Sequence, residues 1–409
     1  MTDIRVGVGT HVRGGTGPRA AMPRSPSAAV MAAWRRHRDL LSNAGSLLAT
    51  TGVTSLLGFI YWIFATRLFS QGSVGYGSAE VSAMTLLGSI GMLGLNTLLI
   101  GELPRRTDRA GLMSAALLAC GLSSLVLGLG FAVVASRVSI RFAVMIGTPD
   151  HAALFAAGVA LTGVTLVFDQ ATIGLMRGGL QLERNIAFAV VKVLALPACA
   201  FILHDRFGFG ITLAWVTGMA LSVALVAVRL WLAGEPVLAR PDWGVLRGLG
   251  RTAMVHNWLN LAMTTPFYFL PVLVTLIVSP SANAAFYIAT MLEAFLALLP
   301  IHLPTVLFAV AAADPQVVAR KLRFALRVSF MIGLPGMAVL ILGAHLALGL
   351  FGKGYEAQAM LPLSWRAGAI LRLSVRALRP ARAPRGGGSW LHRGVHHEEL
   401  GRHPGRPSP

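Results

Sequence analysis

Long apolar runs, separated by short polar connections, make up most of the chain between residues 44 and 360. Each run is about 20 residues long, which is the length that a helix needs to cross the hydrocarbon core of a bilayer. The runs do not alternate apolar and polar positions as membrane barrel strands do. The pattern predicts about nine transmembrane helices, at approximately 44–66, 78–101, 111–136, 152–174, 185–204, 210–232, 255–278, 283–312 and 325–351. We therefore expect an all-α polytopic membrane protein.

The most polar connection within this region, residues 233–254, follows the sixth predicted helix. It divides the helices into a first six-helix bundle over 44–232 and a partial second bundle over 255–360, with a cytoplasmic linker between them. A division of this kind is typical of secondary transporters that are built from repeated halves. Pro266 and Pro271 lie in the seventh predicted helix, where they indicate either kinks beside a cavity or ordinary kinks.

The two ends of the chain have a different composition. Residues 1–43 are rich in Gly, Pro, Ser and Arg and contain no long apolar run, so we expect a disordered, basic cytoplasmic N-terminus. Residues 361–409 form a basic tail rich in Pro, Gly and Arg, and its arginines fall where a tenth helix would begin. A lipid-facing helix could hardly carry them. We expect an aberrant end caused by truncation or a frameshift, and the alternative is a native tail that lies in the membrane interface.

The basic residues of the connections favour one orientation. They are concentrated in the N-terminal region and in the connections after the second, fourth, sixth and eighth predicted helices, as Arg105, Arg106 and Arg240 illustrate. Because Lys and Arg are enriched in cytoplasmic loops, we expect a multi-pass protein of the cytoplasmic membrane with its N-terminus in the cytoplasm.

The composition supports this interpretation and limits the function. Hydrophobic residues make up 55% of the chain and charged residues only 12%, whereas charged residues make up about 25% of a typical soluble domain. A soluble enzyme is therefore excluded. The net charge of +19 would suggest nucleic-acid binding in a soluble protein. Here its distribution follows membrane topology instead, so we expect no nucleic-acid partner.

The sequence carries no convincing motif for catalysis. It has no nucleotide-binding GxxxxGK[ST] pattern, and Cys120 and Cys199 have no partner at metal or disulfide spacing. The predicted outer loops are short and poor in carboxylates, which argues against a glycosyltransferase. We therefore expect no enzymatic activity, no catalytic residue, no metal and no cofactor.

Ionisable residues inside or at the edges of the predicted helices are the candidates for substrate contact, because intramembrane charge is costly and usually faces a cavity or a partner. They are Arg67, Glu80, Arg141, Asp169, Arg177, Arg184, Lys192 and Glu293. Lys192 and Asp169 could instead form a buried structural ion pair, and Arg67 could extend to the outer interface. Glu293 has no basic residue near it in the second half, which makes it a candidate for a cavity-facing or proton-linked group. Gly88, Gly91 and Gly94 are expected to allow close helix packing.

Several segments resemble a known family. The segments TGVTSLLGFIYWIFATRLFSQGSVGYG at 51–77, HNWLNLAMTTPFYFLPVLVTLIVSP at 256–280 and LFGKGY at 350–355 resemble Wzx-like membrane proteins of lipopolysaccharide and polysaccharide biosynthesis. That family belongs to the multidrug/oligosaccharidyl-lipid/polysaccharide exporter superfamily. The resemblance implies two helical bundles around a central cavity, alternating access, and a cationic site for a diphosphate. Arg67, Arg177 and Lys192 are the positions that could supply this site. A cation-coupled exporter of the same superfamily would instead need an acidic ion site, for which Asp169 and Glu293 are the candidates.

From these observations we expect a flippase that moves a polyprenyl-diphosphate-linked oligosaccharide across the cytoplasmic membrane for cell-surface polysaccharide biosynthesis. Its expected partners are this lipid-linked oligosaccharide, membrane lipids and glycan assembly proteins of the cell envelope. The alternatives are a cation-coupled multidrug exporter of the same superfamily, a membrane glycosyltransferase or polymerase, and a non-functional fragment.

Overall fold

The computed structural model describes residues 52–106, 108–175, 177–203, 207–234 and 239–294, together with scattered positions between 335 and 359. The expected N-terminal region 1–43, the tail 361–409 and almost all of the expected helix 325–351 lie outside the described residues. The chain divides into two compact units, which meet between Tyr287 and Ile288. The first unit contains all of the elements discussed below except residues 288–294 of the last helix, which belong to the second unit.

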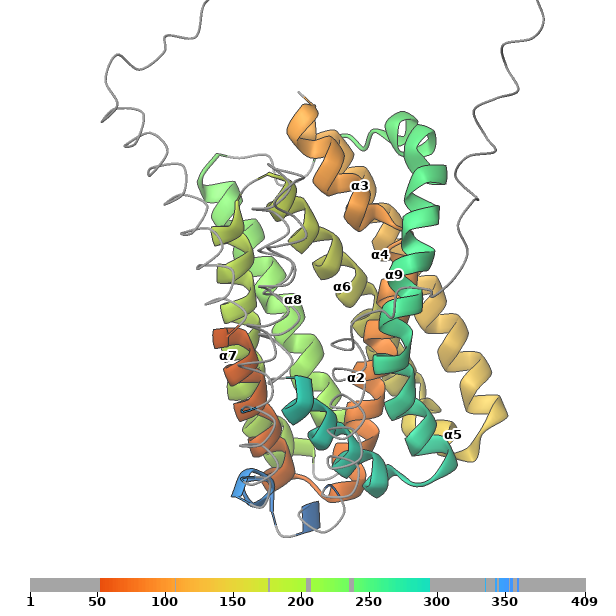
Figure 1. Cartoon of the computed structure of the whole chain (residues 1–409), viewed down its shortest axis with the longest axis vertical. Coiled ribbons are helices and arrows are strands. Elements are labelled where there is room, and N and C mark those ends of the chain that lie inside the picture. The colour runs from red at the N-terminus through yellow and green to blue at the C-terminus, as the bar shows by residue number, and fades with distance from the viewer. Residues whose placement is uncertain are drawn as a thin grey trace, which may run out of the picture. The chain divides into compact units, whose positions relative to one another are not determined.

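Every described element is helical, which confirms the all-α fold expected from the apolar runs (Figure 1). The elements are the helix Gly52–Leu68, α2 (Gln71–Gly91), α3 (Leu95–Glu102), η1 (Leu103–Arg105), α4 (Arg109–Val138), α5 (Ile140–Ile146), α6 (Pro149–Gly174), α7 (Gly178–Leu203), α8 (Phe209–Leu232), α9 (Trp243–Ile277) and a helix over 280–294. Within the described part of the chain, α4, α6, α7 and α8 are long and apolar enough to cross a bilayer. The helix Gly52–Leu68 and the apolar segment Thr264–Ile277 of α9 are shorter.

The structure divides one predicted helix and shortens the predicted linker. The segment expected as a single helix over 78–101 is two helices, because Leu93 and Gly94 take left-handed φ values of 52° and 79° between α2 and α3. Glycine adopts this conformation without steric cost, so Gly94 is a turn residue and not the packing residue that we expected. The second half of the expected linker 233–254 is helical, since α9 begins at Trp243. α9 also continues through Pro266 and Pro271.

Small residues bring the helices of the first unit close together, as expected for membrane helix packing. A Cβ atom added at Gly128 of α4 would lie 2.9 Å from the Cα of Ala156 on α6. One added at Gly88 of α2 would lie 3.0 Å from the backbone nitrogen of Gly163 on α6. Large apolar side chains such as Phe201 and Val126 are exposed on outward faces. The first unit therefore combines tight internal packing with an apolar exterior.

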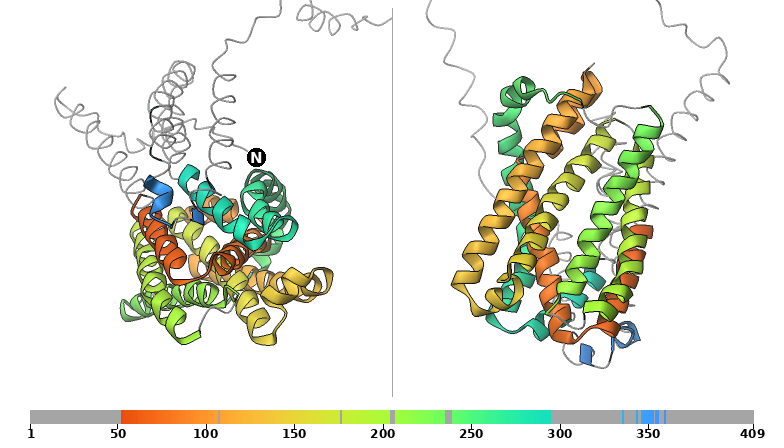
Figure 2. Two further views of the ribbon diagram at one scale, coloured as in Figure 1. Left: turned by 90° about the horizontal axis from the view of Figure 1, so that it is seen from below. Right: turned by 180° about the vertical axis from the view of Figure 1, so that it is seen from behind.

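In Figure 1 the chain runs up α2 and α3, down α4, up α6, down α7, up α8 and down α9, so the unit has two distinct ends (Figures 1 and 2). One end, called here the α5 end, carries α5, the first turns of α2, α6 and α8, and the last turn of α9. The opposite end, called here the linker end, carries η1, the first turn of α4 and the connection 239–242. The positive-inside distribution of the sequence predicts that the linker end faces the cytoplasm.

Candidate functional site

Lys192 lies near the middle of α7, in an aromatic box formed by Tyr61, Phe188 and Trp215. Its side-chain nitrogen Nζ is 3.9 Å from the ring centroid of Trp215, 4.3 Å from that of Phe188 and 5.0 Å from that of Tyr61. The residue is only 4% exposed. A cation over an aromatic face is stabilised by the ring quadrupole, most strongly where water is excluded. Three rings thus hold this ammonium group inside the helix bundle.

The box is rigid because its rings are fixed by neighbouring groups. The Tyr61 hydroxyl donates a hydrogen bond of 2.8 Å to the carbonyl oxygen of Ile211 on α8. Trp62 packs against Tyr61 and lies 4.7 Å, between ring centroids, from Tyr287. These contacts connect the helix Gly52–Leu68 with α7, α8 and the helix over 280–294.

Asp169 pairs with Arg184, and not with Lys192 as we considered from the sequence. The Arg184 guanidinium donates to both carboxylate oxygens, with Nε to Oδ1 at 3.0 Å and Nη2 to Oδ2 at 2.8 Å. Lys192 is eight residues further along α7, about 12 Å along the helix axis, so it is too far along α7 to take Arg184's place. The alternative of a Lys192–Asp169 ion pair is therefore not found in the structure. The charge of Asp169 is matched by Arg184, and among the described residues no carboxylate pairs with Lys192.

A second buried polar cluster lies near the α5 end. The Glu80 side chain on α2 accepts a hydrogen bond from the Thr212 hydroxyl on α8, and its Oε2 lies 3.1 Å from Nε2 of His151 on α6. Glu80 and Thr212 are fully buried, and His151 is 5% exposed. The Phe209 ring packs edge to face with the His151 ring, and their ring centroids are 4.8 Å apart. The cluster thus joins α2, α6 and α8 through buried polar side chains.

Polar contacts at the α5 end connect the first bundle to residues 275–283. The Asn283 side-chain amide donates to the Gly75 carbonyl oxygen at 2.9 Å and to the Ser78 hydroxyl at 3.0 Å. The Arg141 guanidinium on α5 donates to the carbonyl oxygens of Thr275 and Leu276 in the last turn of α9. A cation at a helix C-terminus is favoured by the helix dipole. These contacts fasten α2 and α5 to residues 275–283 at the α5 end.

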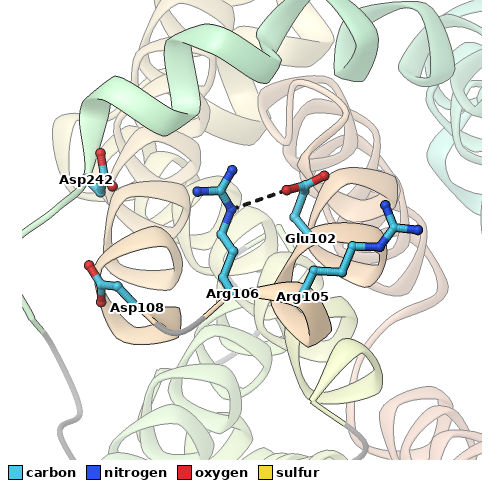
Figure 3. A pocket seen from close by; sticks show the side chains of 5 residues that line it. All are labelled: Glu102, Arg105, Arg106, Asp108 and Asp242. Atoms are coloured by element: carbon cyan, nitrogen blue, oxygen red, sulfur yellow. Dashed lines mark hydrogen bonds and ion pairs between the residues drawn. The ribbon is translucent and has the colours of Figure 1, made fainter. Parts of the chain in front are cut away.

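At the linker end, a polar cleft of about 390 Å³ is lined by Glu102, Arg105, Arg106, Asp108 and Asp242 (Figure 3). Arg106 pairs with Glu102 at 3.2 Å, and Asp108 caps α4 by accepting a hydrogen bond from the Gly111 backbone. The Asp242 backbone N–H donates to the carbonyl oxygen of Gly111. This hydrogen bond fastens the connection 239–242 to the first turn of α4. No group of His, Cys, Asp or Glu suited to a metal ion occurs among the described residues.

The structure does not bring the other expected site residues to the aromatic box. Arg67 is exposed near the α5 end, in the last turn of the helix Gly52–Leu68, whereas Arg177 is exposed at the linker end between α6 and α7. Glu293 is half-buried in the helix over 280–294. Of the three expected cations, Lys192 is the one placed in the interior of the bundle.

Sequence reasoning missed the cluster of Glu80, His151 and Thr212 as a unit. Glu80 stood out as an intramembrane carboxylate, but its partners come from positions 71 and 132 residues away. One available signal was the position of His151 just after Pro149, since proline is common in the first turn of a helix. That signal places His151 at a helix start, although it does not identify the residue it faces.

Solved structures with a similar fold define the structural class of this chain. An inward-facing multidrug resistance MATE family transporter of the MOP superfamily aligns with a TM-score of 0.55 at 17% identity, over 79% of this chain and 77% of that chain. A MOP superfamily transporter from Pyrococcus furiosus, described as having a binding pocket of reversed polarity, gives a TM-score of 0.52 at 16% identity, over 78% and 76% of the two chains. A MATE transporter in complex with MaL6 gives 0.52 at 16% identity, over 80% and 77%.

The fold of this protein is thus similar to that of transporters of the MOP superfamily. No protein-family model and no curated protein sequence matches the chain. Membership of this superfamily and of its Wzx-like family stays a prediction.

Proposed function

We propose that this protein is a transporter of the cytoplasmic membrane that moves a polyprenyl-diphosphate-linked oligosaccharide outward by alternating access. It would supply cell-surface polysaccharide synthesis, working with glycan assembly proteins of the cell envelope. The observation that carries the proposal is the buried cation Lys192, held by aromatic rings inside a transporter fold. The fold supplies the class of activity, and the charge of Lys192 supports an anionic substrate.

The chemistry of the box suits a group that must attract an anion and later release it. Contacts with aromatic rings stabilise a desolvated ammonium group by about 2 kcal/mol or more. A phosphate offers the same group charge-assisted hydrogen bonds, which are shorter and roughly twice as strong as neutral ones. An entering diphosphate would therefore draw Lys192 away from the rings. Arg184 would not compete for it, because its charge is already matched by Asp169.

The two ends of the unit give the proposed direction. In the proposed cycle, the Asn283 and Arg141 contacts keep the α5 end closed, and the substrate enters from the linker end. Release would require the α5 end to open. Alternate opening of the two ends moves the diphosphate across the bilayer centre without exposing it to lipid, where a charged group is costly.

Purified protein in proteoliposomes tests the proposal. A fluorescent polyprenyl-diphosphate-linked oligosaccharide is incorporated, and a membrane-impermeant lectin reports how much glycan reaches the outer leaflet. We expect the wild type to equilibrate the lipid between leaflets, Lys192→Met to slow this at least about tenfold, and Lys192→Arg to retain much of it. Arg137→Met removes an exposed cation on α4 and is the matched control. A wild type that leaves the lipid in one leaflet, or an unimpaired Lys192→Met variant, would contradict the proposal.

A multidrug exporter is the second candidate. It is favoured by the aromatic box, because rings of this kind bind lipophilic cations, and by the multidrug transporter of similar fold. In the wild type, however, the ammonium group of Lys192 occupies the box. If the protein exported lipophilic cations, wild-type proteoliposomes would transport ethidium, whereas the flippase proposal predicts no such transport.

A further inference from the structure

The polar cleft at the linker end takes no part in the proposed binding of the diphosphate by Lys192. Its volume of about 390 Å³ falls within the range of small-molecule sites, about 300–1,000 Å³. The lining comes from the end of α3 with η1, from the residue before α4 and from the residue before α9. All five lining residues are charged: Glu102, Arg105, Arg106, Asp108 and Asp242. The cleft therefore suits a ligand that itself carries charge.

The basic side chains of the cleft have hydrogen-bonding capacity to spare. Arg106 bonds to Glu102 through its Nε atom, and its two terminal nitrogens have no partner among the described residues. The Arg105 guanidinium also has no partner within the described part of the chain. Guanidinium groups form strong, charge-assisted hydrogen bonds to phosphate. This part of the cleft can therefore bind a phosphate group.

Two carboxylates face Arg106 from the side opposite Glu102 (Figure 3). Asp108 accepts one hydrogen bond from the Gly111 backbone, and the Asp242 backbone donates to the carbonyl oxygen of the same glycine. The two acids are thus held next to each other. An ionised carboxylate has about four acceptor positions, so the capping bond leaves Asp108 able to accept others.

The acids of the cleft suit an ammonium group better than a metal ion. No set of three ligands converges on one point among the described residues, whereas an ammonium group only needs acceptors around its three N–H bonds. A purely anionic ligand would meet three carboxylates. The ligand that matches both parts of the cleft is a zwitterion with a phosphate and an ammonium group.

Neighbouring apolar side chains indicate that the cleft lies at the depth of lipid headgroups. Ile100, two residues before Glu102, is 40% exposed, and Trp243, directly after Asp242, is 42% exposed. Tryptophan is enriched where the hydrocarbon core meets the headgroup region. A phospholipid in the leaflet at the linker end can therefore reach the cleft with its headgroup while its chains stay in the bilayer.

We propose that the linker-end cleft is a binding site for the headgroup of an ethanolamine phospholipid. The phosphate binds Arg105 and Arg106, and the primary ammonium group binds Asp108 and Asp242. A bound headgroup connects η1, the first turn of α4 and the connection 239–242. The inference is independent of the proposed transport substrate.

Native mass spectrometry of the purified full-length protein tests the site without any transport measurement. The protein is delipidated in detergent and titrated with phosphatidylethanolamine, phosphatidylcholine or phosphatidylglycerol of the same acyl chains. Phosphatidylcholine has no N–H group to donate, and phosphatidylglycerol has no amine. Because a hydrogen bond to a charged group is lost in each case, we expect the first phosphatidylethanolamine to bind at least about tenfold more tightly than either of the other lipids.

Variants separate the two parts of the cleft. Asn caps a helix about as well as Asp, so the double variant Asp108→Asn/Asp242→Asn should fold normally and lose the preference for phosphatidylethanolamine. Arg106→Gln should weaken the binding of all three lipids, because each contains the phosphate. Asp150→Asn, an exposed acid at the α5 end, is the matched control and should bind like the wild type.

Three results would overturn the inference. The first is a wild type that binds phosphatidylcholine or phosphatidylglycerol as tightly as phosphatidylethanolamine. The second is a double variant that keeps the preference of the wild type, and the third is an Arg106→Gln variant with unchanged affinity for all three lipids.

Discussion

Gly75 on α2 is the position where the closing contact of the α5 end is most sensitive to a small change. A Cβ atom there would overlap the carbonyl oxygen of Pro280, far inside the 3.0 Å that real Cβ contacts respect, and that oxygen belongs to the backbone and cannot rotate away. Gly75→Ala therefore forces α2 and residues 280–283 apart. The separation breaks the hydrogen bonds that Asn283 donates to the Gly75 carbonyl and to Ser78.

The expected cost follows from these contacts. Two hydrogen bonds within a membrane protein contribute about 0.6–1.7 kcal/mol each, and overpacking a tight contact costs about 1–3 kcal/mol. We therefore expect Gly75→Ala to destabilise the folded state by about 2–6 kcal/mol, measured by denaturant unfolding in bicelles. Gly72→Ala, one turn earlier on α2, is the matched control, because its Cβ would lie 4.0 Å from the Ser281 hydroxyl in ordinary contact. Equal stability of the two variants, within about 0.5 kcal/mol, would refute the reasoning.

Two further predictions concern the other end of the first unit. Asp169→Asn leaves the buried guanidinium of Arg184 without its counter-charge, so we expect a loss of about 3–5 kcal/mol in the same unfolding assay. Glu102→Gln removes a more exposed ion pair and should cost at most about 1 kcal/mol; a similar cost for both variants would contradict the pairing. Ser114→Ala removes the hydroxyl that accepts a hydrogen bond from the Ala239 backbone at 2.9 Å. We expect faster proteolysis of the connection 239–242, and an unchanged cleavage rate would show that this bond does not fasten it.

The fold could be predicted from the sequence because apolar runs of bilayer length form transmembrane helices. A buried backbone in lipid must satisfy its own hydrogen bonds, so the runs around 111–136, 152–174, 185–204 and 210–232 correspond to α4, α6, α7 and α8. The break between α2 and α3 was missed because Gly94 also fits a small-residue packing pattern. Only its left-handed φ distinguishes a turn from a contact.

The candidate site was only partly predictable. Lys192 stood out because a cation within an apolar run is rare, but nothing in the sequence shows that Trp215 and Tyr61 surround it, since these rings come from other helices. Two basic residues of α7, Arg184 and Lys192, are candidates to pair with Asp169 of α6. Which of them does so depends on how α6 and α7 align along their axes. Which side chains from different helices meet depends on how the helices pack, and the residue pattern within each helix does not show this.

Alternating access through the α5 end is the central claim, and a disulfide across that end tests it most directly. With both native cysteines replaced, Gly72→Cys and Ser281→Cys place two thiols close enough for a disulfide, since a Cβ at position 72 lies 4.0 Å from the Ser281 hydroxyl. The measurement is the rate of lipid-linked oligosaccharide flipping in proteoliposomes before and after reduction. We predict that the oxidised protein does not flip the lipid and that a reductant restores flipping. Undiminished flipping by the fully cross-linked protein would contradict the account.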